Sequence, residues 1–216
     1  MYNHLINLQK KLAKRVRLTP YKKDFKLIAG IDVSFSIKHS LSFCSIVVLN
    51  KYFELIEVSC SFKKINLPYI PGLLSFRELP VIFQAYKKLK NKPDIFILDS
   101  QGIAHPRKLG LASHFGVVFN VPSIGCAKSK LVGTYKVPPA KKLSFTELIY
   151  KNEIVGYVLR SRENVKPIFI SPGNLVDFDS SLNIIKQMLN KYRLPEPTRL
   201  AHIYAEKFKK HILKTL

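Results

Sequence analysis

The sequence has few acidic residues, few cysteines and no long apolar run. Of its 216 residues only 14 are Asp or Glu, against 36 Lys or Arg, which gives a formal net charge of +22 at pH 7. This excess favours a polyanionic partner, because each phosphate that a basic side chain neutralises releases condensed counterions. A basic proteome or an adaptation for solubility would produce the same imbalance. The charge therefore favours nucleic acid as a partner without establishing it.

The three cysteines are too scattered for a disulfide framework or a zinc site. They stand at positions 44, 60 and 126, with no Cys-x-x-Cys pair or Cys/His cluster. Cys44 and Cys60 could face each other on neighbouring strands, but packing in a core explains them better. This cysteine usage fits a reducing compartment, and we expect a cytoplasmic location.

No stretch approaches the roughly 20 apolar residues that a membrane helix needs, and the N-terminus lacks the apolar segment of a signal peptide. Leu5, Leu8, Leu12 and Val16 instead recur at near-helical spacing with lysines between them. This spacing predicts an amphipathic helix whose basic face is solvated or lies near phosphates. We expect one domain over residues 1–216 with amphipathic helical ends, and a monomer, since no coiled-coil pattern occurs.

Between these ends the sequence alternates between strand and helix patterns. Strands are predicted at 25–36, 41–50, 51–62, 93–99, 121–130, 153–160 and 167–173, helices at 75–90, 107–119, 177–192 and 195–216, and a loop at 133–147. Three opening strands followed by alternating elements predict an α/β fold with a mixed central β-sheet flanked by helices. That layout is compatible with a ribonuclease H-like fold.

Three of the few acidic residues stand in apolar surroundings. Asp32 falls within a predicted strand, Asp99 ends another, and Glu78 lies in an apolar helical start. An ionised carboxylate in such a place is unfavourable unless it is paired or coordinates a metal. Each acid alone could be paired with one of the many lysines. Together, at one end of a sheet, they would form an oxygen-rich anionic site suited to Mg²⁺ or Mn²⁺ and to phosphodiester hydrolysis.

The segment PYIPG at residues 68–72 predicts a stiff apolar tip. Two prolines bracket an aromatic and a β-branched residue, and Gly72 then frees the backbone. Such a tip is either an ordinary turn packed on its own domain or a wedge that enters a stack of bases.

At this point the sequence resembles the endonuclease V family, which nicks nucleic acid near deaminated bases, chiefly hypoxanthine. Six blocks in the same order carry the resemblance, at residues 29–35, 68–78, 101–117, 121–133, 170–182 and 192–202. The resemblance implies a ribonuclease H-like fold, in agreement with the predicted strand order.

The resemblance also implies roles for individual residues. Asp32, Glu78 and Asp99 match the family's metal-binding carboxylates, with Mg²⁺ as the expected cofactor and Mn²⁺ as a substitute. Lys128, in GCAK, matches a lysine near the scissile phosphate, where it would stabilise developing negative charge. The other matching positions are the wedge residues Pro68, Tyr69, Ile70 and Pro71, the base-pocket residues Gly72, Leu74, Ser100 and Gly110, and the nucleic-acid contacts Arg77 and His105.

Two positions depart from the family pattern. Asn174 occupies a place where a histidine is often found near the second metal, and its amide oxygen is a candidate ligand. Asp177 or Asp179 would be the alternative source of that contact. Ser100 stands where a glycine is usual, and its side chain would narrow the pocket or add a hydroxyl contact.

The resulting prediction is a metal-dependent nuclease of DNA repair. It would cut at the second phosphodiester bond 3′ to a deaminated base and leave 3′-hydroxyl and 5′-phosphate ends, as the family does. An endoribonuclease specific for inosine in RNA, a reader of damaged nucleic acid that does not cut, and a basic structural protein are the alternatives.

Overall fold

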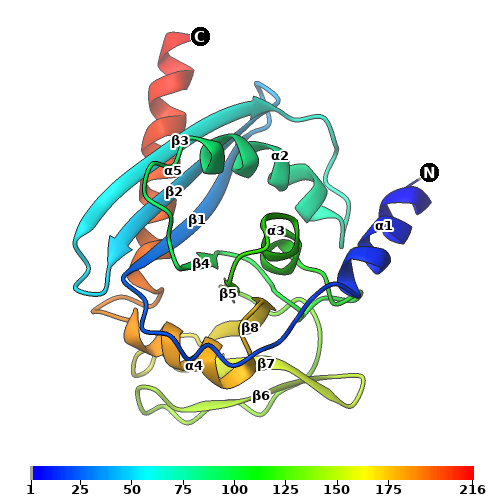
Figure 1. Cartoon of the computed structure of the whole chain (residues 1–216), viewed down its shortest axis with the longest axis vertical. Coiled ribbons are helices and arrows are strands. Elements are labelled where there is room, and N and C mark those ends of the chain that lie inside the picture. The colour runs from blue at the N-terminus through cyan, green and yellow to red at the C-terminus, as the bar shows by residue number, and fades with distance from the viewer. Residues whose placement is uncertain (1) are drawn as a thin grey trace.

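A computed structural model describes residues 2–216 of the protein, which are arranged around an eight-stranded sheet (Figure 1). The strands are β1 (Leu27–Ser36), β2 (Leu41–Asn50), β3 (Leu55–Lys64), β4 (Ile95–Leu98), β5 (Ser123–Ala127), β6 (Phe145–Tyr150), β7 (Glu153–Leu159) and β8 (Ile168–Asn174). The helices are α1 (Asn3–Ala13), α2 (Leu74–Lys87), α3 (Leu111–Phe119), α4 (Phe178–Gln187) and α5 (Glu196–Thr215).

The sheet is mixed, and its parallel pairs lie in the centre. The strand order is β3-β2-β1-β4-β5-β8-β7-β6. The pairs β1–β4 and β4–β5 are parallel, whereas all other neighbours are antiparallel. The predicted α/β fold, with its antiparallel opening strands, is therefore confirmed.

Helices cover both faces of the central strands. Along β4, Ile95 and Ile97 pack in the cluster that includes α4 and α5, while Phe96 and Leu98 pack in the cluster that includes α2 and α3. A central strand covered on both faces reads as a continuous apolar run rather than an alternating one. This explains why the sequence around IFIL predicts a buried strand so clearly.

The register of β2 and β3 separates two of the three cysteines. Cys44 is opposite Ser61, and Cys60 is opposite Ser45. Side chains alternate between the faces of a sheet, so Cys44 and Cys60 point to opposite faces and do not meet. All three cysteines are free thiols.

The main difference from the predicted elements is β6, which begins inside the segment predicted as a loop. It pairs antiparallel with β7 across Lys151 and Asn152, both of which have a positive φ. Two such central residues are typical of the tight turns that join hairpin strands. Asn152 is a residue type common in such turns, and it follows the proline-containing stretch that favoured a loop.

The predicted N-terminal helix is present as α1, and it docks through the face that carries Leu5 and Leu12, which are half-buried. Leu8 is 44% exposed, and the only buried residue of the helix is Gln9, which is fully buried. Gln9 stands four residues after Leu5 and three before Leu12, so a polar residue occupies the most buried position of the apolar face. No helix within residues 2–216 is long and apolar enough to cross a membrane.

The contact between α2 and α3 includes a buried histidine, His114, from which we expect the stability of the fold to decrease in acid. His114 is hydrogen-bonded to Ser75 at 2.9 Å and stacks edge-on against Phe76, and burial lowers its pKa to about 4. Between pH 6.5 and 4 the unfolded chain therefore binds more protons than the folded one, so stability is lost as pH falls.

We expect His114→Gln to lower the pH dependence of stability. Between pH 6.5 and 5 the wild type should lose about 2 kcal/mol more unfolding free energy than the variant, since one pKa unit corresponds to about 1.4 kcal/mol. Urea unfolding of both proteins at several pH values measures this difference. Parallel stability curves would contradict it.

Candidate active site

Asp32 and Asp99 lie side by side at one edge of the sheet. β1 and β4 run parallel with Ile31 opposite Leu98, so the next residue in each chain segment is an aspartate. The amide of Asp99 donates to the carbonyl of Ile31 at 3.1 Å, which extends the pairing by one step. The two side chains are only 11% and 8% exposed. The structure thus brings these two predicted acids together.

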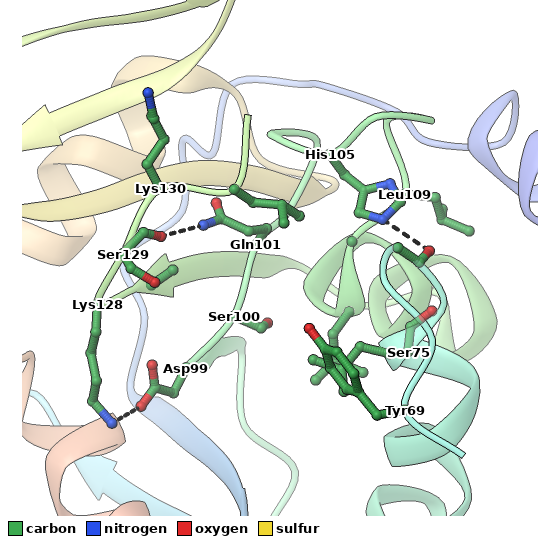
Figure 2. A pocket seen from close by; sticks show the side chains of 16 residues that line it. Tyr69, Ser75, Asp99, Ser100, Gln101, His105, Leu109, Lys128, Ser129 and Lys130 are labelled. Carbon is green, nitrogen blue, oxygen red and sulfur yellow. Dashed lines mark hydrogen bonds and ion pairs between the residues drawn. The ribbon is translucent and has the colours of Figure 1, made fainter. Parts of the chain in front are cut away.

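Lys128 reaches the same edge from the next parallel strand. It follows β5, and its Nζ forms an ion pair with Oδ2 of Asp99 (Figure 2). The main chain here is held by Arg193, whose Nη2 donates to the carbonyls of Lys128 at 2.7 Å and Pro167 at 2.8 Å. Lys128 is therefore fixed beside Asp99 and is not a free surface lysine.

Glu78 approaches from α2, on one face of the sheet. It is 8% exposed and forms no ion pair within residues 2–216. Burial raises its pKa to about 8, the charges of Asp32 and Asp99 add to the rise, and Arg77 opposes it. Burial also raises the pKa of Asp32, with Asp99 acting in the same direction. The three carboxyl groups thus form one repelling cluster.

A fourth residue at this edge, His202, has no place in the sequence prediction. It comes from α5 on the other face of the sheet, and its Nδ1 is 2.8 Å from Oδ2 of Asp32. This hydrogen bond, with the charge of Lys128, opposes the rise in the pKa of Asp32. The only sequence signal was the TRLAH end of the last block that resembles the family.

Asn174 is not near this cluster, which contradicts its predicted place near a metal. In the antiparallel pairing of β5 with β8, Asn174 is opposite Ser123, at the far end from Lys128. Its Oδ1 accepts from the amide of Arg17 at 3.0 Å, and its Nδ2 donates to the carbonyl of Gly116 at 3.0 Å. The residue is 2% exposed, so its role is to hold the main chain.

The two alternatives to Asn174 also have structural partners. Asp177 caps α4 by accepting from the amide of Ser180 at 2.8 Å, as predicted for that helix. Asp179 accepts from the hydroxyl of Tyr157 at 3.0 Å. Both follow the far end of β8, so neither replaces a ligand at the Asp32 edge.

A cavity of about 330 Å³ opens beside Asp99 and Lys128 (Figure 2). All four residues predicted for the base pocket line it, together with Tyr69 of the predicted wedge and His105. Its remaining lining residues are Ser75, Gln101, Leu109, Leu111, Ala127, Ser129, Lys130 and Leu131. The acidic edge and the cavity therefore share a wall.

Comparison with known proteins decides the family. A sequence model described as Endonuclease V matches residues 10–203. The chain belongs to the endonuclease V family. It is 51% identical to endonuclease V of Thermosipho melanesiensis over 98% of this chain and 92% of that protein, and 48% identical to that of Dictyoglomus turgidum over 95% and 90%. The resemblance stated from the sequence is thus confirmed.

Solved structures agree with the fold. Endonuclease V of Streptomyces avermitilis superposes with a TM-score of 0.94 at 32% identity, over 99% of this chain and 95% of that one. Endonuclease V of Ciona intestinalis, in complex with a 24mer DNA containing an inosine followed by a ribo-adenosine, gives a TM-score of 0.84 at 26% identity, over 97% and 98%. The ribonuclease H-like fold is confirmed, and this endonuclease V is a nuclease that acts on phosphodiester bonds.

The acidic cluster of this endonuclease V has the chemistry of a site for a hard divalent cation. No three His, Cys, Asp or Glu side chains within residues 2–216 lie close enough to hold an ion as they stand. However, Glu78 is a buried carboxyl group without an ion-pair partner, and its two nearest acids raise its pKa rather than lower it. A cation would reverse that repulsion. Carboxylate oxygens are the ligands that such a cation prefers, so Asp32, Glu78 and Asp99 are the residues that would hold one.

The predicted wedge segment, residues 68–71, lies largely at the surface beside the cavity. Tyr69 is 66% exposed, Pro68 and Pro71 are exposed, and Ile70 is half-buried. Immediately after them Gly72 has a φ of +78° and turns the chain into α2. An apolar tip that is fixed at its base and free at its end has the form that insertion between bases requires.

The predicted nucleic-acid contacts Arg77 and His105, and the predicted pocket residue Ser100, are all at least partly buried. Arg77 is half-buried, its guanidinium lies 4.6 Å from the ring centre of Phe35, and its Nε has no hydrogen-bond partner in the described part of the chain. His105 is 4% exposed, and its Nε2 is hydrogen-bonded to the carbonyl of Gly72, directly after the predicted wedge, instead of facing solvent. Oγ of Ser100 is buried, lines the cavity and has no partner among residues 2–216. Its predicted effect on the choice of base stays a prediction.

Proposed function

We propose that this endonuclease V uses a divalent cation, Mg²⁺ or Mn²⁺, to nick DNA beside a deaminated base. The target is hypoxanthine, the cut falls at the second phosphodiester bond on its 3′ side, and the products carry 3′-hydroxyl and 5′-phosphate ends for repair. The observation that carries the proposal is the shared wall between cavity and acidic edge, formed by Asp99 and Lys128. A DNA strand whose base enters the cavity would therefore lie close to the acidic edge.

The related Ciona protein supports the choice of substrate, since it binds DNA that contains an inosine. The cavity volume of about 330 Å³ suits a single nucleobase with its sugar. Hypoxanthine presents an accepting O6 and a donating N1–H, whereas adenine presents the reverse. A pocket that pairs with the first pattern leaves buried groups unpaired with the second, which is the physical basis of selection.

At the acidic edge the residues have separate tasks. A cation bound by Asp32, Glu78 and Asp99 would activate the attacking water and offset charge on the leaving oxygen. Lys128 places a positive charge beside Asp99, where negative charge grows on the phosphate. His202 holds Asp32 by a hydrogen bond from the other face of the sheet. The three free cysteines fit action in a reducing cytoplasm.

The test is a nicking assay on matched substrates. A 5′-labelled duplex with one deoxyinosine and an identical duplex with deoxyadenosine are incubated with Mg²⁺, Mn²⁺ or EDTA, and the products are sized to the nucleotide. We expect a cut one nucleotide beyond the 3′ bond of the inosine, only with a metal and only in the first duplex.

Other results would redirect the proposal. Inosine-selective binding without a cut would make the protein a reader. A third substrate, with a ribonucleotide 3′ to the inosine, separates a deoxyribonuclease from an inosine-specific endoribonuclease, because only the ribose offers a 2′-hydroxyl. Cutting of this third substrate alone would favour RNA.

A further inference from the structure

The carbonyl of Gly72, directly after the predicted wedge, accepts three hydrogen bonds from side chains elsewhere in the protein. The carbonyl oxygen of Gly72 accepts from Nε2 of Gln9 at 3.0 Å, from Nη2 of Arg107 at 2.7 Å and from Nε2 of His105 at 3.1 Å (Figure 2 shows the bond from His105). A carbonyl has two lone pairs, so three donors saturate it. The position of the wedge base is therefore fixed from outside its own segment.

The protonation of His105 is consistent with this role. Its Nδ1 accepts from the amide of Arg107 at 3.2 Å, so Nε2 carries the proton that is donated to Gly72. Burial and the charge of Arg107 lower the pKa of His105 to about 4, which keeps the ring neutral. A neutral ring with one accepting and one donating nitrogen satisfies both contacts.

Gln9 is the residue that joins the two walls of the cavity. Its Nε2 donates to Gly72 on the wedge side and, at 2.9 Å, to the carbonyl of Leu109 on the other side. Its Oε1 accepts from Nε of Arg107. Leu109, Gly110 and Gly72 all line the cavity. Both polar atoms of the Gln9 side chain are thus used, in three hydrogen bonds, and Gln9 comes from a helix that supplies no other buried residue.

We propose that Gln9 is a positioning residue that sets the width of the base pocket and hence the preference of the enzyme for inosine. This inference rests on the proposed function and extends it to α1, which the acidic edge does not involve. A planar base is held by walls whose spacing must be correct to within a few tenths of an ångström, because hydrogen bonds weaken steeply with misalignment. A buried amide that bonds to both walls fixes that spacing.

The decisive variant is Gln9→Glu. A carboxylate still accepts from Arg107 but has no proton to donate, so Gly72 and Leu109 both lose their bond and face a like-charged oxygen. Gln9→Met keeps the volume and removes the hydrogen bonds without adding charge. The matched control is Asn7→Asp, which makes the same change in charge at an exposed position of the same helix.

The measurement compares affinities without cutting. Each protein is titrated by fluorescence anisotropy, in EDTA, into a single strand with one deoxyinosine and into the same strand with deoxyadenosine, and thermal unfolding is recorded in parallel. For Gln9→Glu and Gln9→Met we expect the inosine preference to fall by about tenfold to a hundredfold, the range for leaving one buried acceptor unpaired. That acceptor is the carbonyl of Leu109, because Gly72 keeps its bonds from Arg107 and His105. Affinity for the adenosine strand should change little. The unfolding temperature of the Gln9 variants should fall by about 5 °C, which leaves them folded during the titration, and Asn7→Asp should match the wild type.

The outcomes separate this inference from the proposed function. A wild type without inosine preference would refute the substrate, whatever the variants do. A wild type with preference, and folded Gln9 variants with the same preference, would overturn the role of Gln9 alone. Equal loss of affinity for both strands would also overturn it, because a general structural defect does not select between bases.

Discussion

Asp99→Asn should reduce nicking of an inosine-containing strand by about a thousandfold or more while leaving inosine-selective binding nearly unchanged. The variant keeps the shape of the side chain and removes one of the three carboxylates that would hold the proposed cation. Cation-derived stabilisation of a phosphodiester transition state is several kcal/mol, and about 4 kcal/mol corresponds to three orders of magnitude in rate. Binding survives because the cavity wall is intact.

Stability provides a second expectation for this variant. Removing the charge of Asp99 relieves its repulsion of Glu78 and Asp32, whose pKa values it raises. The lost ion pair to Lys128 contributes little, because that lysine is 41% exposed. We therefore expect Asp99→Asn, without metal, to unfold at the same temperature as the wild type or a higher one.

Single-turnover nicking, binding in EDTA and thermal unfolding measure these three quantities. The control is Asp24→Asn, which removes the same charge from a side chain that is 80% exposed. Nicking by Asp99→Asn at the wild-type rate would refute the acidic edge as the site of cutting. A lower unfolding temperature would show instead that Asp99 is structural.

Gly30→Ala should destabilise the protein by about 3 kcal/mol, the upper part of the range for overpacked cores. A Cβ on Gly30 would lie 2.1 Å from both the carbonyl carbon and oxygen of Pro197 and 2.5 Å from the amide nitrogen of Thr198. These are backbone atoms of the first turn of α5, which cannot rotate away. The helix itself must move.

The same variant should also weaken nicking, because α5 carries His202 to Asp32, two residues from Gly30 in β1. Urea unfolding measures the first effect. A nicking assay without urea, at a temperature well below the unfolding temperature, measures the effect on activity. Wild-type stability would mean that α5 shifts without loss of packing, and wild-type nicking in a destabilised protein would mean that the position of His202 is not critical.

Local sequence patterns predicted most of the sheet and the two aspartates. IFIL followed by Asp99, and an apolar run around Asp32, need only the knowledge that strands buried on both faces are continuously apolar. Their adjacency follows from parallel pairing. The role of Lys128 required the family resemblance, since one lysine among 36 basic residues has no distinctive local pattern.

Long-range contacts explain what the sequence did not predict. His202 and Asp32 are 170 residues apart, and nothing in an amphipathic helix marks which residue meets a distant strand. Asn174 was expected at the wrong edge of the sheet, because the edge at which a strand-end residue lies depends on the direction of its strand. β8 is antiparallel to β5, so its C-terminal end is the far end of the sheet. Gln9 was missed because the leucine pattern marks the buried face of α1 but does not show that a polar residue on this face is the most buried one.

The contribution of α5 to the acidic edge has a consequence for protein synthesis. The chain is made from its N-terminus, and its domains begin to fold as they emerge. Asp32, Glu78 and Asp99 are therefore synthesised long before α5, the helix that carries His202 and packs on Gly30. A nascent chain on the ribosome is surrounded by RNA, and it would lack the last helix throughout that exposure. The order of the elements thus delays assembly of the proposed cutting site until the chain is nearly finished.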